Sequence, residues 1–363
     1  MRILHTEASC GWGGQEIRIL EEASGLIARG HQVSVACPQH ARLTTEAARF
    51  GVPVVAMPIE FKTWTGFLSL RNYLSTHAFD VVNTHSSADS WLTGLACSTL
   101  QQAPAIVRTR HISAPVSGNP INRWLYRRAA KVVTTGESLR LQLLAAVRLD
   151  PGKAVSVPTG IDTARFYPAD KAAAKLALGL DPTKRYLGVV ATLRSWKGHS
   201  YLLDAFCSLE QTNLHLLIVG DGPQLPAIRE KIAALGIGSR VLLSGQQMNP
   251  EMWLGAMDVF CLPSYANEGV PQALVQAMMC GLPIVTTPVG AILEAVTDSQ
   301  SALVVPPKDP PALTAAISRL LDDPTLGQQL GIAARKYAEA HFSREVMLNR
   351  MEEIFLVASA ETG

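Results

Sequence analysis

Short apolar runs alternate with longer amphipathic stretches along nearly the whole chain. The short runs are rich in Val, Ile and Leu, which is typical of strands buried on both faces of a parallel sheet. The longer stretches repeat apolar residues at helical spacing, so the chain predicts a series of β–α units. After an opening strand, the runs lie at residues 33–37, 52–56, 80–84, 105–108 and 131–135, and then at 187–191, 214–219, 241–244, 259–262, 283–287 and 302–305.

This pattern lapses once, between Val157 and Pro168, where proline and glycine cluster. A chain of 363 residues is also about the right length for two α/β domains. We therefore predict two doubly wound domains, residues 1–160 and 161–341, and a C-terminal segment over residues 342–363. Ligands bind such sheets outside the carboxyl ends of the strands, so we expect the site in a cleft that the two domains face. Two further helices are predicted, at residues 312–336 and 343–359.

Composition places the chain among globular proteins. It is 48% hydrophobic and 17% charged, which excludes a disordered chain. Six scattered cysteines form no CxxC pair and no Cys/His cluster along the sequence, which argues for reduced thiols and against a zinc site. The first residues lack the apolar run of a signal peptide, and no stretch reaches the length of a spanning helix. We expect a cytoplasmic protein, either soluble or peripheral on the inner face of the plasma membrane.

The charge is unevenly distributed. Residues 1–155 contain 16 Lys and Arg against 10 Asp and Glu, and the remainder contains 16 against 20. A basic first half suggests an anionic partner, such as a phospholipid surface or a phosphorylated glycan, although ordinary surface asymmetry explains it equally well. Arg123, Arg127 and Arg128 lie beside Trp124 and are candidates for acceptor or membrane contact. The alternative is a helix that packs its aromatic side chains inward and exposes its cations. Nucleic acid is not an expected partner, because the net charge is only +2 and no known module is present.

A glycine-rich turn follows the opening strand, in Gly11-Trp-Gly-Gly-Gln-Glu16. Gly13 and Gly14 would let the backbone approach a phosphate at a helix N-terminus. Glu16 occupies the third glycine position of the dinucleotide fingerprint, so a nicotinamide cofactor is poorly supported. A structural turn and a phosphate contact both remain open at this position.

Two further motifs lie at strand ends in the second half. Arg194 and Lys197 precede Gly198, and a guanidinium with an ammonium three residues away suits a diphosphate. The alternative is a pair of solvated loop cations. In the run from Pro263 to Gly281, Glu268 precedes a predicted helix, whose N-terminal amides could bind phosphate while the carboxylate binds sugar hydroxyls.

These motifs together resemble the family 4 retaining glycosyltransferases. The resemblance rests on Val157-Pro-Thr-Gly-Ile-Asp162, Leu217-Ile-Val-Gly-Asp-Gly-Pro223, Arg194 with Lys197, Asp258-Val-Phe-Cys-Leu-Pro-Ser264, the run from Glu268 to Gln276, and Pro288-Val-Gly-Ala-Ile-Leu-Glu294. It covers nearly the whole chain and is most specific in residues 157–310. It implies the GT-B architecture of two Rossmann-like domains, with a C-terminal helix that crosses back to the N-terminal domain. The N-terminal domain would bind the acceptor and the C-terminal domain the donor.

The resemblance also implies roles for individual residues. Glu268 and His111 would lie beside the donor sugar, and Arg194 and Lys197 would bind the diphosphate. Gln276 stands where the family has the glutamate that binds the nucleotide ribose, so it would lose the charge-assisted part of those hydrogen bonds. The remaining donor contacts would come from Gly13, Gly14, Gly269 and Val270. His85, at a strand end, is a candidate on the acceptor side, whereas His5, His31, His199 and His215 are assigned structural or solvated positions.

The expected reaction is transfer of a hexose-type sugar from a nucleotide sugar, with UDP or GDP as the nucleotide. The acceptor would be a lipopolysaccharide, O-antigen or exopolysaccharide glycan. Retention of the anomeric configuration would proceed by front-face substitution, with no metal and no cofactor. Two alternatives remain: a sugar-nucleotide 2-epimerase of the same architecture, and a non-catalytic homologue that binds a sugar nucleotide or a partner enzyme.

Overall fold

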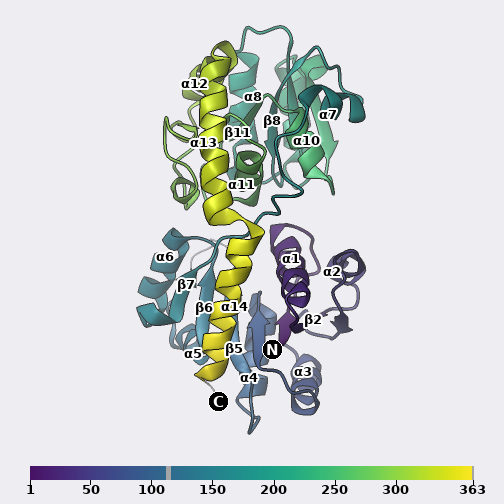
Figure 1. Cartoon of the computed structure of the whole chain (residues 1–363), viewed down its shortest axis with the longest axis vertical. Helices are drawn as coiled ribbons and strands as arrows, with labels where there is room; N and C mark the ends of the chain where they lie inside the picture. The colour runs from purple at the N-terminus through teal and green to yellow at the C-terminus, as the bar shows by residue number, and fades with distance from the viewer. Residues whose placement is uncertain (112–115, 362–363) are drawn as a thin grey trace. The chain divides into compact units, whose positions relative to one another are not determined.

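The computed structural model describes residues 1–111 and 116–361, and the chain forms two compact units. The first unit consists of residues 1–160 together with the segment from Arg344 onward, and the second consists of residues 161–343. In each unit, helices cover a parallel sheet, as Figure 1 shows. Two Rossmann-like units of this kind confirm the predicted fold class.

The first unit contains a seven-stranded sheet within its described residues, in the order β3-β2-β1-β4-β5-β6-β7. Every strand pair is parallel, so the carboxyl ends of the strands share one edge. The strands are β1 (Arg2–Thr6), β2 (Gln32–Cys37), β3 (Val54–Ala56), β4 (Val81–Thr84), β5 (Ala105–Arg110), β6 (Lys131–Thr134) and β7 (Ala154–Ser156). The helices are α1 (Gly14–Ala28), α2 (Arg42–Glu46), α3 (Trp64–Thr76), α4 (Ser87–Cys97), α5 (Pro120–Arg128), α6 (Glu137–Val147) and α14 (Arg344–Ala360).

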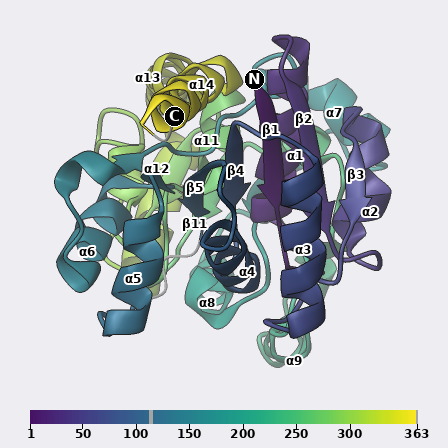
Figure 2. The ribbon, with the colours of Figure 1, turned by 90° about the horizontal axis from the view of Figure 1, so that it is seen from below.

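Alternate residues of each strand fill cores on opposite faces of this sheet. Ile3 and Val35 pack with α1 and α14, whereas Leu4 and Ala36 face the core beneath α3 and α4. Figure 2 shows α3, α4 and α5 along one side of the sheet.

The C-terminal helix α14 is part of the first unit because it packs directly on α1. A Cβ atom at Gly25 would lie 2.4 Å from a methyl carbon of Leu348, so a side chain at this position would force Leu348 to shift. Arg29 adds ion pairs to Glu345 at 2.6 Å and Glu352 at 2.8 Å. The expected return of the C-terminal helix to the N-terminal domain is therefore confirmed.

The second unit contains a six-stranded parallel sheet in the order β10-β9-β8-β11-β12-β13. Its strands are β8 (Arg185–Val190), β9 (Leu214–Val219), β10 (Val241–Gly245), β11 (Val259–Leu262), β12 (Ile284–Thr286) and β13 (Leu303–Val304). Its helices are α7 (Lys171–Ala177), α8 (His199–Cys207), α9 (Leu225–Ala234), α10 (Pro250–Ala256), α11 (Gln272–Met279), α12 (Pro310–Asp322) and α13 (Pro324–Phe342).

The prediction of a single helix over residues 312–336 is wrong. Residues 312–336 form parts of two helices, α12 and α13, which are separated at Asp323. Pro324 cannot donate a backbone hydrogen bond within a continuing helix, and the Asp323 side chain caps the new helix by accepting from the Leu326 amide. None of the described helices is both long enough and apolar enough to cross a bilayer.

Candidate functional site

An ion pair joins two of the predicted donor residues in the second unit. Lys197 Nζ lies 2.7 Å from Glu268 Oε1, and Ser264 Oγ donates to the same oxygen at 2.5 Å. The Glu268 side chain is almost fully buried, at 5% exposure, whereas Lys197 is more open to solvent. A buried carboxylate needs such partners, because an unpaired charge away from water is strongly unfavourable. The ion pair therefore fixes the positions of both side chains.

Two glycines bring the loops that carry these residues into contact. Gly198 has a φ of 76°, and a Cβ atom there would lie 2.0 Å from the Pro263 carbonyl oxygen. Gly290 has a φ of 59°, and its Cβ atom would lie 2.0 Å from the carbonyl oxygen of Glu268. Neither backbone conformation nor spacing admits a side chain. The loops after β8, β11 and β12 therefore meet around Glu268 at one edge of the sheet.

The remaining predicted donor residues of this unit lie on the same loops or on α11. Arg194 is exposed and precedes the short 3-10 helix Ser195–Lys197, where its guanidinium lies 5.8 Å from the Trp196 ring centre. Gly269 is half-buried and Val270 is buried, just before α11 begins. Gln276 is half-buried in the second turn of that helix. The structure thus presents two cations, a carboxylate and a helix N-terminus, which together suit a phosphorylated sugar.

In the first unit, the glycine-rich turn leads directly into α1. Gly13 is the N-cap residue of that helix, and exposed Gly14 is its first residue. The turn is anchored by Glu7, which accepts hydrogen bonds from the Ser9 amide and from the Gln15 side chain. Sequence reasoning missed Glu7, although its position immediately after β1 was an available signal.

The Glu7 carboxyl group is fully buried. Burial, together with the neighbouring Asp89 carboxyl, raises the pKa of Glu7 from 4.5 to about 8. At neutral pH the folded chain therefore keeps a proton on Glu7 that the unfolded chain releases.

This proton predicts a pH dependence of stability. Below about pH 4.5 Glu7 is protonated in both states, and between pH 4.5 and 8 the unfolding free energy falls by up to about 1.4 kcal/mol per pH unit. Glu7→Gln removes this loss, so the variant should gain stability relative to the wild type as pH rises, with no further gain above pH 8. Urea denaturation across pH 5–9 measures the difference. Glu353→Gln, at an exposed carboxyl of the same unit, is the control, and a Glu7→Gln difference that does not change with pH would contradict the prediction.

Three histidines of the first unit form a hydrogen-bonded chain. His5 Nδ1 lies 2.9 Å from His85 Nε2, and His85 Nδ1 lies 2.9 Å from His111 Nε2. The residues come from the strand β1 and from the ends of β4 and β5, which are adjacent in the sheet order β1-β4-β5. The structure therefore brings the candidates His85 and His111 together. It also places His5, which we assigned a structural or solvated position, in the same chain.

The histidine chain is neutral because charge is disfavoured throughout it. Burial lowers the pKa of His5 from 6.5 to about 3, with a further contribution from the buried Arg18 guanidinium. Burial and neighbouring charges also hold the pKa values of His85 and His111 well below 6.5. Arg18 is itself fully buried and donates to the Val157 carbonyl oxygen at 2.7 Å. His111 is therefore suited to hydrogen bonding rather than to carrying charge.

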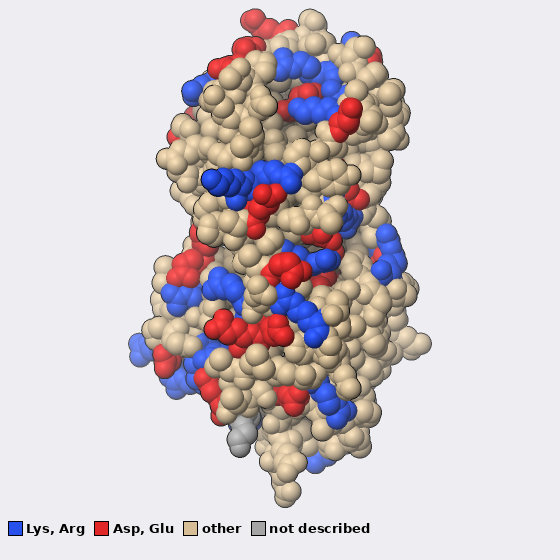
Figure 3. Space-filling view, in the orientation of Figure 1, with Lys and Arg blue, Asp and Glu red and all other residues tan. Residues whose placement is uncertain are grey.

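The three candidate arginines lie together on α5. Arg123, Arg127 and Arg128 line a hollow of about 350 Å³ with Pro120 and Trp124. Trp124 is 38% exposed and stacks on Trp91 of α4, so it is not packed wholly inward. Basic and acidic side chains are interspersed on the face drawn in Figure 3. The hollow on α5 brings together the positive charges of three arginines.

Metal-ligating side chains gather at a different place. Among the described residues, the one cluster with suitable spacing is Cys10, His40 and Glu60. It contains none of the predicted donor residues.

Two family descriptions match successive parts of this chain. Residues 12–165 match the description "Glycosyltransferase Family 4", and residues 170–337 match "Glycosyl transferases group 1". A lipopolysaccharide core biosynthesis mannosyltransferase of Rhizobium meliloti is 32% identical over 212 residues, which cover 56% of this chain and 58% of that protein. The chain thus matches little more than half the length of that relative. A galactosyltransferase of Escherichia coli is 26% identical over 90% of this chain and 89% of its own length. Its name gives UDP-Gal as the donor and α-D-GlcNAc-diphosphoundecaprenol as the acceptor.

Solved structures agree on the fold. A glycosyltransferase from Rickettsia africae superposes with a TM-score of 0.86 at 20% identity, over 98% of each chain. The Anabaena protein HepE, solved in complex with UDP-glucose, gives a TM-score of 0.83 at 20% identity, over 98% of this chain and 99% of its own. The two family descriptions meet near the boundary between the units and account for the motifs on which the resemblance rests. The chain therefore belongs to the family 4 glycosyltransferases, with the group 1 glycosyltransferase domain as its second half.

Proposed function

We propose that this chain transfers a hexose from a nucleotide sugar to a bacterial envelope glycan, with retention of the anomeric configuration and without a metal in the reaction. The observation that carries the proposal is the Lys197–Glu268 ion pair, held among loops that also present Arg194 and the N-terminus of α11. A diphosphate needs fixed positive charge, and a hexose needs a fixed hydrogen-bond acceptor. This arrangement supplies both.

Each side chain has a defined task in the proposed reaction. Arg194 and Lys197 bind the diphosphate and stabilise the negative charge that develops as the sugar–phosphate bond breaks. Amides at the N-terminus of α11 add partial positive charge, and Glu268 accepts a hydrogen bond from the sugar. In front-face substitution the leaving phosphate oxygen takes the acceptor proton, so the protein contributes positioning and electrostatic stabilisation. His111 is assigned a hydrogen bond to the sugar.

Similar proteins support the choice of substrates. Relatives of this chain are described as a lipopolysaccharide core mannosyltransferase, a UDP-Gal-dependent galactosyltransferase and a GDP-mannose-dependent phosphatidylinositol mannoside mannosyltransferase. Envelope glycans and glycolipids are the acceptors common to these names, and both UDP and GDP occur among the donors. We therefore assign this chain a glycolipid or lipopolysaccharide-type acceptor, with UDP or GDP as the nucleotide.

The decisive experiment incubates the purified chain with UDP- and GDP-hexoses and a glycolipid acceptor fraction, with and without EDTA. The expected product has the anomeric configuration of the donor, determined by NMR, and forms equally well in EDTA. Conversion of UDP-GlcNAc to its 2-epimer without acceptor would instead identify an epimerase. Donor binding with neither transfer nor slow hydrolysis would identify a non-catalytic homologue.

Gln276→Glu is expected to tighten nucleotide binding. A carboxylate forms charge-assisted hydrogen bonds with ribose hydroxyls, and the gain of about 1 kcal/mol over an amide corresponds to roughly fivefold in Kd. Isothermal titration calorimetry with UDP and GDP measures the change. Gln329→Glu introduces the same charge on the exposed surface of α13 and is the matched control. If Gln276→Glu bound UDP and GDP no more tightly than the wild type, Gln276 would not be a nucleotide-binding residue.

We also propose that the surface around α5 binds anionic phospholipid. Exposed Trp64 is the first residue of α3, and exposed Phe61 lies in the loop just before it. The helix α3 packs against α4, and α4 packs against α5 with its three arginines. Aromatic side chains beside cations are typical of interfacial contacts. Changing Arg123, Arg127 and Arg128 together to Gln should abolish most sedimentation with phosphatidylglycerol vesicles at low salt, with phosphatidylcholine vesicles as the control. Undiminished sedimentation of the variant would reject this surface as the phospholipid-binding site. If the variant instead kept its vesicle binding and lost only sugar transfer to a soluble acceptor, the arginines would be assigned to acceptor binding.

A further inference from the structure

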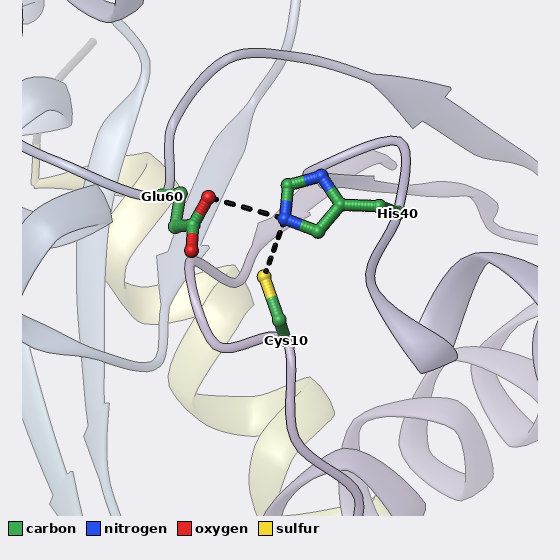
Figure 4. Close-up of side chains that lie close together, drawn as sticks. All are labelled: Cys10, His40 and Glu60. Carbon is green, nitrogen blue, oxygen red and sulfur yellow. Dashed lines mark hydrogen bonds and ion pairs between the residues drawn. The ribbon is translucent and has the colours of Figure 1, made fainter.

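Three loops of the first unit each contribute one metal-ligating side chain to a single point. Cys10 lies in the loop after β1, His40 in the loop after β2 and Glu60 in the loop after β3. These strands are neighbours in a parallel sheet, so their following loops lie at the same edge. Figure 4 shows the three side chains pointing toward one another. Residues so far apart in the sequence give no spacing motif, and sequence analysis therefore found no such cluster.

The geometry is that of ligands around an ion. His40 Nε2 lies 3.3 Å from Cys10 Sγ and 3.1 Å from Glu60 Oε2, and the three ligand atoms all lie within 4.8 Å of one another. One imidazole nitrogen offers either one proton or one lone pair, so hydrogen bonding at Nε2 satisfies only one of these neighbours well. A cation between the three atoms satisfies all of them. Ligand atoms around tetrahedral zinc lie about 3.3–3.6 Å apart at the usual bond lengths, within a few tenths of an ångström of the two separations from His40 Nε2.

The charges and ligand types also suit one class of ion. A divalent cation bound to the Cys10 thiolate and the Glu60 carboxylate would be neutralised by these two ligands together, with His40 as a neutral third ligand. Sulfur, nitrogen and oxygen ligands in one set favour zinc, whereas magnesium and calcium prefer oxygen alone. The His40 side chain is 66% exposed, so the position between the three ligand atoms is open to solvent. A metal ion can enter there, and a water molecule can serve as its fourth ligand.

We propose that Cys10, His40 and Glu60 form a zinc site that fastens the glycine-rich turn to the loops after β2 and β3. Cys10 directly precedes Gly11 and lies three residues before Gly13, so an ion held there restrains the chain immediately before the turn. The ion is structural and takes no part in the proposed transfer step. The test of this metal site therefore does not depend on the proposed function.

Cobalt is the probe that tests this site, because thiolate-to-cobalt charge transfer and intense visible bands report sulfur ligation and tetrahedral geometry. The full chain, without an affinity tag and stripped of metal, is titrated with Co²⁺ and then with Zn²⁺. Cys10→Ser and His40→Ala are compared with Cys207→Ser and His77→Ala, at an exposed cysteine and an exposed histidine outside the cluster. Circular dichroism melts in EDTA establish that each variant is folded.

The expected result is a single equivalent of cobalt with a charge-transfer band that zinc abolishes. Cys10→Ser should lose the band, His40→Ala should weaken binding at least about tenfold by analogy with other ligand-shell changes, and both controls should match the wild type. Octahedral cobalt without the band overturns the proposal. So does a band that survives Cys10→Ser or is lost in Cys207→Ser.

Discussion

Lys197→Ala is expected to lower kcat/KM for sugar transfer by about 10²–10³-fold, the usual cost of removing a group that stabilises transition-state charge. The side chain lies 2.7 Å from Glu268 and remains partly open to solvent, so its ammonium can contact both the carboxylate and an incoming phosphate. Its loss removes a positive charge that would stabilise the leaving diphosphate in the proposed reaction. It also leaves buried Glu268 with Ser264 as a partner but without a counter-ion. Arg194→Ala should act in the same direction, since that cation is aligned by the same loop.

Initial rates at varied donor concentration measure this effect, and UDP or GDP binding by calorimetry separates affinity from chemistry. Lys231→Ala is the matched control, because Lys231 also forms an ion pair in the second unit, with Asp204 at 2.6 Å. A thermal melt shows whether each variant remains folded. Intact turnover by Lys197→Ala and Arg194→Ala would reject the mechanism, whatever happened to donor affinity.

The periodicity of the chain predicted most of the fold. Long buried strands such as β9 are apolar at every position but one, His215 in this strand, so their position is visible in the sequence. The strand β7 has three residues, of which two are only half-buried, and it was not among the predicted runs. The break between α12 and α13 was missed because the apolar spacing continues across Asp323, while Pro324 and the Asp323 cap end one helix and begin the next.

The location of the proposed donor residues was predictable because they follow strands within short motifs, and strand ends share an edge in a parallel sheet. Contacts between distant segments were not predictable in this way. His5 looked like any polar residue within a strand, and only the pairing of β1 with β4 places it beside His85. The Cys10 cluster, and the Asp89 carboxyl that helps to raise the pKa of Glu7, depend on the same kind of tertiary proximity.

The histidine chain is expected to fix the proton of His111 on Nδ1. Each ring is neutral and holds one proton, so the two 2.9 Å hydrogen bonds must run in the same direction along the chain. His5 Nε2 is buried and has no hydrogen-bond partner among the described residues. A buried N–H group without a hydrogen-bond partner is rarer than a buried acceptor without one. His5 Nε2 is therefore the unprotonated nitrogen, and the proton lies on Nδ1. His5 then donates to His85 and His85 to His111, which leaves His111 with an Nδ1–H donor.

Nitrogen-15 NMR of the histidine side chains measures this arrangement directly, and all three rings should show the Nδ1–H tautomer. His111→Ala should lower kcat by about 10²-fold, as for loss of one hydrogen-bond donor to the reacting group. His5→Leu should cause a smaller loss of kcat with donor KM unchanged, since His85 and His111 can then adopt either tautomer. His5→Asn should restore both kcat and the His111 tautomer, because its amide can donate from near the position of Nδ1. An Nε2–H signal for His111 in the wild type, or equal behaviour of the Leu and Asn variants, would show that His5 does not act through this chain.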